Sequence, residues 1–388
     1  MSVPNFAKRK QRSKRRIPHS GSLLLLRLRH PNCPFLFRRN WSRANPKSKE
    51  HFSLVSAEAL RGGGGTDSFV QFPLEKGSRK VYNYSTKMHK ILVILGPTAT
   101  GKSDLAVKLA RRYNGEVISA DSRQVYKGLD IGTGKITKKE MQGVPHHMLD
   151  IVSPKKVFTV SEWKKIAEEK IKDILSRGKL PIICGGTGFY IRYIVYNISL
   201  PEVPPNKELR KKLGKKTVSE LFEILNKLDP RRAKNIAKEQ GSKNPVRLIR
   251  AIEIVAALGK IPPIYRPNRK TYKFLQIGLN AKPEISKERI HIRLFARIRE
   301  GMIREVRNLH KNGLSWKRMN ELGLEYRYLS RYLQKKITKA ELIKKLETEI
   351  WRYAKRQMTW FKRDNRIKWY SPAETMKIEK EVAKFLKT

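Results

Sequence analysis

The residues best suited to chemistry form one short segment, Gly96-Pro97-Thr98-Ala99-Thr100-Gly101-Lys102-Ser103, which fits the pattern G-x-x-x-x-G-K-[ST]. Glycines let a backbone approach an anion closely, and the N–H groups of such a loop point at phosphate oxygens. Lys102 adds a positive charge, and the Ser103 hydroxyl is placed to ligate Mg²⁺. The segment therefore predicts a nucleotide- or diphosphate-binding loop, without saying which phosphorylated ligand binds.

A carboxylate at the end of the next apolar run is the second chemical candidate. Asp121 follows the run 117–120, in the stretch Ser119-Ala120-Asp121-Ser122-Arg123-Gln124-Val125-Tyr126. The carboxyl ends of parallel strands face the ligand crevice of an open sheet, so Asp121 should lie near the phosphate loop. The residues alone leave three roles open: a Mg²⁺ ligand as in kinases and ATPases, a helix N-cap, or a general base acting on a nucleophile. We favour the base.

Other residues that could bind a metal fit that role poorly. His146 and His147 are adjacent, and neighbours on a loop rarely both ligate one ion, so we expect a structural or substrate-loop role. Cysteine occurs only at Cys33 and Cys184. Two cysteines exclude a disulfide framework, a cysteine-rich zinc site and a C-terminal zinc finger.

Strand and helix patterns alternate in the part of the chain that carries these residues. The apolar runs 91–95, 117–120 and 180–184 predict buried parallel strands. Helical periodicity appears at 105–110 and 161–176. Such βαβ units predict an α/β fold, with a P-loop NTPase-like parallel sheet flanked by helices.

After residue 200 the pattern becomes mainly helical. Pro201, Pro204 and Pro205 interrupt the alternation, and the helices predicted at 217–228 and 245–258 belong to a helical insertion domain. The C-terminal region is helical and basic. Its predicted elements are a strand at 274–279, helical stretches at 284–311 and 338–360, and a short strand at 367–370.

The charge of the chain points to a polyanionic partner. There are 86 Lys and Arg against 34 Asp and Glu, which gives a net charge of +52. Nucleic acid is the first candidate for such a surface and an acidic membrane the second. No apolar run reaches the roughly 18 residues that a membrane span needs, so we expect no membrane association by a spanning helix.

The first 87 residues differ from the rest. They hold 19 Lys and Arg against 4 Asp and Glu and lack regular periodicity, so we expect a basic, disordered N-terminal arm. A transit peptide and a misassigned start, with Met88 as the natural one, are the alternatives. We expect a cytoplasmic protein, or an organellar one if the arm is a transit peptide. The expected parts are the arm 1–87, a P-loop α/β core 88–202, the insertion 203–270, and the core completion with the C-terminal region 271–388.

Several motifs occur in a fixed order between residues 90 and 370. After the P-loop come Asp121-Ser122-x-Gln124-Val125-Tyr126, Asp130-Ile131-Gly132-Thr133-x-Lys135, Val144-Pro145-His146-His147, Gly185-Gly186-Thr187-Gly188-Phe189-Tyr190, Pro245-Val246-Arg247-Leu248-Ile249-Arg250-Ala251-x-Glu253 and Ala354-Lys355-Arg356-Gln357-x-Thr359-Trp360-Phe361. On these motifs the chain resembles the tRNA dimethylallyltransferase (isopentenyltransferase) family, over nearly all of its predicted folded part.

The resemblance implies transfer of a dimethylallyl group from dimethylallyl diphosphate to N6 of an adenosine next to the tRNA anticodon. It implies Mg²⁺ as cofactor, and we expect a monomer. Asp121, Thr98 and Lys102 would be catalytic, with Asp121 accepting the N6 proton, and Gly96–Ser103 would hold the diphosphate. The residues expected to contact tRNA are Asp121, Ser122, Arg123, Gln124, Thr187, Arg210, Val246, Arg247, Leu248, Ile249, Arg250, Met319, Asn320, Glu321, Leu322, Gly323 and Leu324.

One segment departs from the family pattern. Where many relatives have a Gly-Tyr pair, this chain has Glu321-Leu322-Gly323-Leu324-Glu325-Tyr326-Arg327. The match to the family is therefore weaker at 319–324 than at the other segments expected to contact tRNA. Arg247, Arg250 and Arg356 are candidate extra phosphate clamps, with a solvated surface role as the alternative. Most of the C-terminal aromatics should pack in the core, and the others could stack on unpaired bases. These aromatics are Tyr326, Tyr328, Tyr332, Trp351, Tyr353, Trp360 and Phe361.

Three other functions compete with this hypothesis. They are prenylation of free adenine nucleotides, phosphate transfer by a small-molecule P-loop kinase, and RNA binding without catalysis. The large positive charge and the long basic C-terminal region favour a polymeric substrate over a free nucleotide.

Overall fold

The structure is a computed structural model that describes residues 35–39, 52–56, 88–238, 243–261 and 271–388. The chain forms two compact units, Met1–Asn83 and Tyr84–Thr388. In the first unit, strands β1 (Phe35–Arg39) and β2 (Phe52–Ser56) pair antiparallel. The rest of the predicted disordered arm lies outside the described residues, so that expectation stays a prediction.

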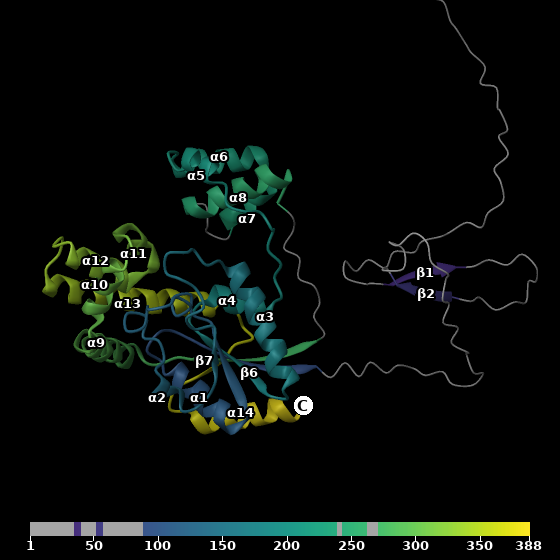
Figure 1. The fold of residues 1–388 in the computed structure, drawn as a ribbon, viewed down its shortest axis with the longest axis horizontal. Coiled ribbons are helices and arrows are strands. Elements are labelled where there is room, and N and C mark those ends of the chain that lie inside the picture. Colours follow the sequence, from purple (N-terminus) through teal and green to yellow (C-terminus); the bar gives the residue numbers. More distant parts are fainter. Residues whose placement is uncertain (1–34, 40–51, 57–87, 239–242, 262–270) are drawn as a thin grey trace, which may run out of the picture. The chain divides into compact units, whose positions relative to one another are not determined.

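The second unit is built on a parallel sheet with the order β5-β4-β6-β3-β7-β8 (Figure 1). This confirms the predicted parallel α/β core. Strand β5 was not predicted, because two residues are too few to show an alternating pattern. The bounds are β3 His89–Leu95, β4 Gly115–Ser119, β5 His146–His147, β6 Leu180–Gly185, β7 Tyr272–Leu279 and β8 Lys368–Tyr370.

Helices cover both faces of the sheet because alternate residues of a strand point to opposite sides. In β3, Leu92 and Ile94 pack in a cluster with α1 (Lys102–Arg112) and α14 (Thr375–Lys387). Ile91 and Val93 pack in a second cluster on the other face, with α3 and α4. Figure 1 shows α1 and α14 below the sheet and α3 and α4 above it. The remaining bounds are α2 Lys138–Met141, α3 Val160–Ser176 and α4 Gly188–Val195.

The C-terminal region forms more helices than the sequence predicted. The stretch 284–311 was expected to be one helical segment, but it divides at Gly301, whose φ of 105° ends α9 and begins α10. This positive φ suits glycine, which has no Cβ to clash there. The bounds are α9 Pro283–Glu300, α10 Met302–Lys311, α11 Trp316–Leu322, α12 Leu324–Leu333 and α13 Lys339–Phe361.

The helical insertion has a hydrophobic cluster of its own, in which Leu221, Leu225 and Leu248 are fully buried. The predicted helices 217–228 and 245–258 are confirmed, and Thr217 and Asn244 cap them through their side chains. Two shorter helices were not predicted. The bounds are α5 Lys207–Leu213, α6 Val218–Leu228, α7 Pro230–Lys238 and α8 Pro245–Leu258.

Among the described residues, no helix combines the length and the apolar character needed to cross a bilayer.

Candidate active site

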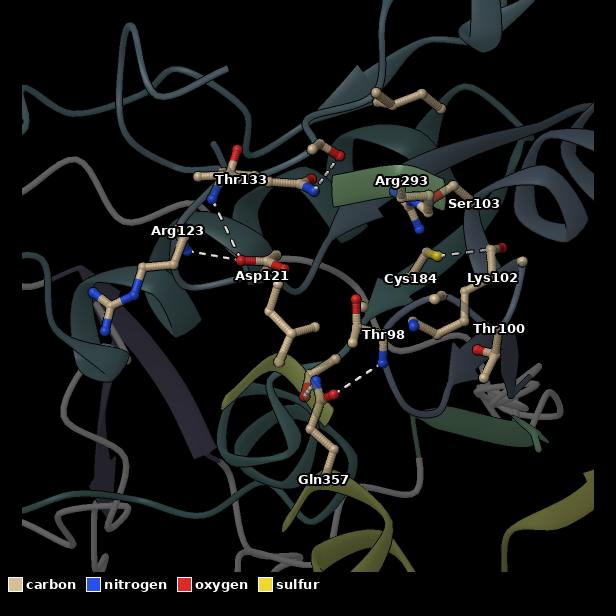
Figure 2. Close-up of a pocket in the computed structure, with 18 of the residues that line it drawn as sticks. Thr98, Thr100, Lys102, Ser103, Asp121, Arg123, Thr133, Cys184, Arg293 and Gln357 are labelled. Atoms are coloured by element: carbon tan, nitrogen blue, oxygen red, sulfur yellow. Dashed lines mark hydrogen bonds between the residues drawn. The ribbon is translucent and has the colours of Figure 1, made fainter. Parts of the chain in front are cut away.

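The loops that follow β3, β4 and β6 meet at one edge of the sheet, because these strands are neighbours and run in the same direction. Together with α9 and α13 they line a cavity of about 850 Å³ (Figure 2). Residues Thr98–Ser103 and Asp121–Gln124 both line it. The structure therefore brings the phosphate loop and the Asp121 carboxylate into one pocket, as the strand order predicted.

The phosphate loop owes its shape to its glycines. Gly96 has a φ of 142°, and a Cβ there would lie 2.4 Å from the Leu279 carbonyl oxygen, so another residue would displace the loop or β7. Gly101, with a φ of 80°, is the N-cap of α1. Thr100 Oγ1 donates to the Pro97 carbonyl oxygen at 2.9 Å and closes the turn. The loop thus places the N-terminus of α1 at the pocket, where its N–H groups attract an anion.

Lys102 lies at the base of this loop and is half-buried. Burial lowers its pKa from the usual 10.5 to about 8, and the nearby Arg293 guanidinium lowers it further, while Asp121 acts in the opposite direction. Its Nζ donates to the Pro97 carbonyl oxygen. Burial also raises the pKa of the neighbouring Cys184 thiol to about 12, so this thiol stays protonated. A desolvated ammonium group of this kind gains strongly from a bound anion.

Asp121 is held by the turn that follows it. Its Oδ1 accepts hydrogen bonds from the backbone N–H groups of Arg123 (2.8 Å) and Gln124 (3.4 Å). Thr187 Oγ1 accepts from the Ser122 N–H at 3.0 Å and ties the turn to the start of α4. Residues 122–125 form a turn and no helix, so the helix N-cap interpretation of Asp121 is wrong. Within the described part of the chain, Oδ2 has no hydrogen-bonding partner, and it is the atom available for proton transfer.

Gln357 joins the phosphate loop to the end of β6. It lies on α13 and is 7% exposed; its Oε1 accepts from the Thr98 N–H at 2.9 Å, and its Nε2 donates to the Gly186 carbonyl oxygen at 2.9 Å. Figure 2 shows the side chain reaching toward Thr98 from the helix below the pocket. The sequence analysis included Gln357 in a motif but gave it no role. Its role is visible only once α13 is placed against the loop.

Three arginines of α9 form a basic wall that the sequence analysis missed. Arg289, Arg293 and Arg297 are spaced four residues apart, so they share one helix face, and all three line the cavity. Arg293 is exposed on the cavity side, but desolvation by the surrounding protein lowers its pKa, and the Arg297 guanidinium lowers it further. Arg297 Nη1 lies 3.8 Å from Glu325 Oε1. The spacing of these arginines was the available signal, but it could not show which partner the helix face met.

Comparisons with known proteins agree with this geometry. The sequence profile of the family described as IPP transferase matches residues 124–364. The tRNA dimethylallyltransferase of Caldanaerobacter subterraneus subsp. tengcongensis is 44% identical over 291 residues, which are 72% of this chain and 91% of that protein. The chain belongs to the IPP transferase family.

Solved structures lead to the same family. The tRNA isopentenylpyrophosphate transferase of Bacillus halodurans is 35% identical, with a TM-score of 0.59 over 77% of this chain and 97% of that one. A eukaryotic dimethylallyltransferase, described as acting on tRNA, is 27% identical, with a TM-score of 0.62 over 73% of this chain and 74% of that one. The parallel sheet and its P-loop-like edge are therefore those of an IPP transferase.

Two of the residues expected to contact RNA are engaged within the insertion of this IPP transferase. Arg210 donates to both carboxylate oxygens of Glu253, at 2.9 and 2.8 Å. Arg250 donates to the same carboxylate at 2.5 Å and to the Val203 carbonyl oxygen at 2.7 Å. These bonds hold the pKa of the buried Glu253 carboxyl at about 2, although burial alone would raise it. Arg210 therefore braces α5 against α8, and Arg250 ties α8 to the segment that precedes α5.

The segment 319–324 divides between core and pocket. Met319 and Leu322 are fully buried, and so is Leu248 in the insertion, so the structure does not bring these three side chains to the pocket. Gly323 and Leu324 do line it. The remaining predicted residues of these two segments are placed as follows: Val246 is exposed, Arg247 and Ile249 are half-buried on α8, Asn320 donates to the Trp316 carbonyl oxygen, and Glu321 pairs with Arg318.

The histidine pair has structural bonds. His147 Nε2 lies 2.7 Å from a carboxylate oxygen of Glu116, which also pairs with Arg177 and Lys179. His146 Nδ1 lies 2.8 Å from the Val144 carbonyl oxygen. Among the residues that the structure describes, no three His, Cys, Asp or Glu side chains are grouped to hold a metal ion. This arrangement fits a structural role, which is one of the two roles expected from the sequence.

Most of the C-terminal aromatics belong to the hydrophobic core, as expected. Tyr326 and Phe361 are buried within it, while Tyr328, Tyr332, Trp351 and Trp360 pack against it. Tyr353 instead lines the cavity, next to Arg356, whose guanidinium lies 5.9 Å from the centre of its ring.

Proposed function

We infer that this IPP transferase moves a dimethylallyl group from dimethylallyl diphosphate to N6 of an adenosine next to the tRNA anticodon and releases diphosphate. The observation that carries this inference is the placement of the Asp121 carboxylate in the same pocket as the phosphate loop and Lys102. One oxygen of that carboxylate has no hydrogen-bond partner among the residues that the structure describes. The names of the relatives support the same reaction.

The basic side of the pocket stabilises the leaving group, diphosphate. Negative charge builds on the diphosphate oxygens as the bond between carbon and oxygen breaks. Lys102, the N–H groups at the start of α1 and the Arg293 guanidinium face this charge from fixed positions. Groups oriented in advance in a buried site stabilise such charge better than water does, because they need no reorganisation.

The incoming amine needs a base. The lone pair on the exocyclic nitrogen of adenine is delocalised into the ring, which makes N6 a weak nucleophile. As N6 forms its bond to the dimethylallyl carbon, its proton passes to Asp121 Oδ2. The two backbone N–H groups on Oδ1 fix the orientation of the carboxylate for that transfer. The reacting base has to leave the loop stack to reach the pocket.

The pocket also fits Mg²⁺ of the kind held mainly by substrate. The Ser103 hydroxyl and the Asp104 carboxylate are oxygen donors lining the cavity, and Mg²⁺ commonly uses one or two protein oxygens with substrate phosphates and water. Ser103, at the start of α1, would hold the ion beside the phosphates. A bound ion would neutralise part of the diphosphate charge.

The surface around the pocket suits a polymeric substrate. Arg352, Lys355, Arg356 and Arg363 of the α13 region line a groove together with Trp360. Trp360 is half-buried, and basic side chains beside an accessible aromatic edge can hold an RNA backbone and stack a base. This groove supports RNA over a free nucleotide as the substrate. The monomeric state and the cytoplasmic location stay predictions.

The direct test is an assay with labelled dimethylallyl diphosphate. Unmodified tRNA should accept the label, whereas AMP and ATP should not. Transfer only to AMP or ATP would replace the proposal by prenylation of free nucleotides, and phosphate transfer from ATP without prenyl transfer would make the chain a kinase. A chain starting at Met88 should match the full chain if the arm is dispensable for catalysis.

A further inference from the structure

A cluster of arginines lies outside the cavity, where the insertion meets the core. Arg192 (α4), Arg232 (α7) and Arg247 (α8) lie near the Tyr193 side chain. Arg363, just after α13, lies near Arg247, and we call these four residues the arginine cluster. Burial lowers the pKa of Arg247, and the other three guanidinium groups lower it further. None of the four lines the phosphate-loop cavity. Four like charges converge here from four separate elements.

The strongest sign that the arginine cluster binds a ligand from outside the chain is an unpaired hydrogen-bond donor. Arg232 Nε is buried and has no hydrogen-bond partner among the described residues. The nearest carboxylate, Asp229, is already engaged, because its Oδ1 accepts from the Arg232 backbone N–H at 2.9 Å and its Oδ2 from the Ile261 N–H at 3.2 Å. Buried polar groups in folded proteins are nearly always bonded, so an orphaned guanidinium donor points to an anion from outside the chain.

Aromatic rings adjoin the arginine cluster. Phe189 is 43% exposed and packs on Tyr193, with ring centres 4.6 Å apart, and its edge meets Trp360. The Arg363 guanidinium lies 5.8 Å from the centre of the Trp360 ring. Cationic groups next to exposed rings form the combination that holds single-stranded RNA, where phosphates bind the charges and bases stack on the rings.

We propose that the arginine cluster binds a backbone phosphodiester of the RNA substrate at a nucleotide next to the reacting adenosine, with Phe189 meeting the base of that nucleotide. The proposal rests on the function inferred above. The distance between the arginine cluster and Asp121 suits neighbouring nucleotides. Thr187 bonds the turn that holds Asp121, and Arg192 lies five residues further along α4, which is about 8 Å of helix. An RNA phosphate at this position would pair Arg232 Nε and link α7 and α8 to α4.

The test compares three charge-removing variants: Arg232→Gln, Arg192→Gln, and Lys234→Gln as the matched control. Lys234 is an exposed residue of the same helix as Arg232, so its loss removes the same charge away from the arginine cluster. Arg192 is exposed on α4, so its substitution should leave folding intact. Binding of an anticodon stem-loop RNA is measured across salt concentrations, and binding of dimethylallyl diphosphate is measured in parallel.

Arg232→Gln and Arg192→Gln should each weaken RNA binding about tenfold and reduce the salt dependence of log K by about one unit of slope. Lys234→Gln should do neither, and the affinity for dimethylallyl diphosphate should not change in any variant. Arg232→Lys should regain part of the RNA affinity because it restores the charge. Unchanged RNA binding in both cluster variants, with normal transfer by the parent chain, would overturn this proposal alone. Weaker binding of dimethylallyl diphosphate in the cluster variants would assign the arginine cluster to the prenyl donor, and would also overturn the proposal. A parent chain that does not bind RNA would instead overturn the proposed function.

Discussion

Binding of dimethylallyl diphosphate should weaken as the pH rises above 8, because the Lys102 ammonium then loses its proton. Burial holds the pKa of Lys102 at about 8 in the free protein. A bound diphosphate adds two or more negative charges beside the amine and should raise its pKa back toward the usual 10.5. Binding would therefore take up a proton at high pH, and each pH unit above 8 should cost up to tenfold in affinity.

The size of the effect follows from the protonated fraction. With a pKa of about 8, nearly all of the lysine is charged at pH 7 and only about 3% at pH 9.5, so the affinity should fall about 30-fold over this interval. Two other cavity groups that could lose a proton in this range are shifted out of it. The pKa of the Cys184 thiol is raised to about 12, and burial moves that of Tyr353 still further up. The terminal phosphate is already ionised above pH 7.5.

The assay is calorimetric titration of dimethylallyl diphosphate into the protein between pH 7 and pH 9.5. Lys102→Arg is the matched control, because a guanidinium stays protonated over this range and its variant should show a flat profile, whatever its absolute affinity. An affinity for the parent chain that does not change with pH would refute the reasoning. An equal fall in the Lys102→Arg variant would assign the titration to another group.

Lys102 should also affect folding stability, because between pH 8 and 10.5 the unfolded state binds more protons than the folded state. The free energy of unfolding should therefore rise by about 3 kcal/mol over that range, and denaturant titrations of the Lys102→Met variant should lack this rise. Asp121→Asn should lower single-turnover transfer by about 10²–10⁴-fold while RNA affinity changes little, and retained transfer would exclude Asp121 as the base. Gln357→Leu should lower the free energy of unfolding by about 2–5 kcal/mol, because the Thr98 N–H and the Gly186 carbonyl lose their hydrogen-bond partners. Urea denaturation measures this change, and an unchanged midpoint would show that the two groups find other partners. Glu253→Gln should destabilise the insertion by about 3–5 kcal/mol by leaving two arginines without their carboxylate, and hydrogen exchange confined to α5–α8 should reveal it; uniform protection there would contradict this expectation.

Local patterns were sufficient for most of the sheet and for the phosphate loop. The strands at 91–95 and 180–184 were predictable because buried parallel strands are continuous apolar runs. The loop was predictable because glycines and a lysine at fixed spacing have few other uses between a strand and a helix. The position of Asp121 followed from strand direction alone.

Other features could not be predicted because their partners are distant in the sequence. Gln357 lies 259 residues from Thr98, and no local pattern records that hydrogen bond. The division at Gly301 depends on one backbone conformation that a helical periodicity does not exclude. The pairing of Arg210 and Arg250 with Glu253 was likewise not predicted, and their contact with RNA stays a prediction.

The sequence by itself determined the kind of chemistry: a loop that holds phosphates, a carboxylate at a strand end and a surface charge suited to RNA. These properties are set by residue types and short spacings. Only the tertiary structure decided which charges act together. It partly buried Lys102 beside Arg293, and it left one oxygen of Asp121 without a hydrogen-bond partner in the described part of the chain. It also gathered the arginine cluster from three helices and the turn after α13. Desolvation and pairing depend on neighbours that packing brings together, and packing joins residues that lie hundreds of positions apart.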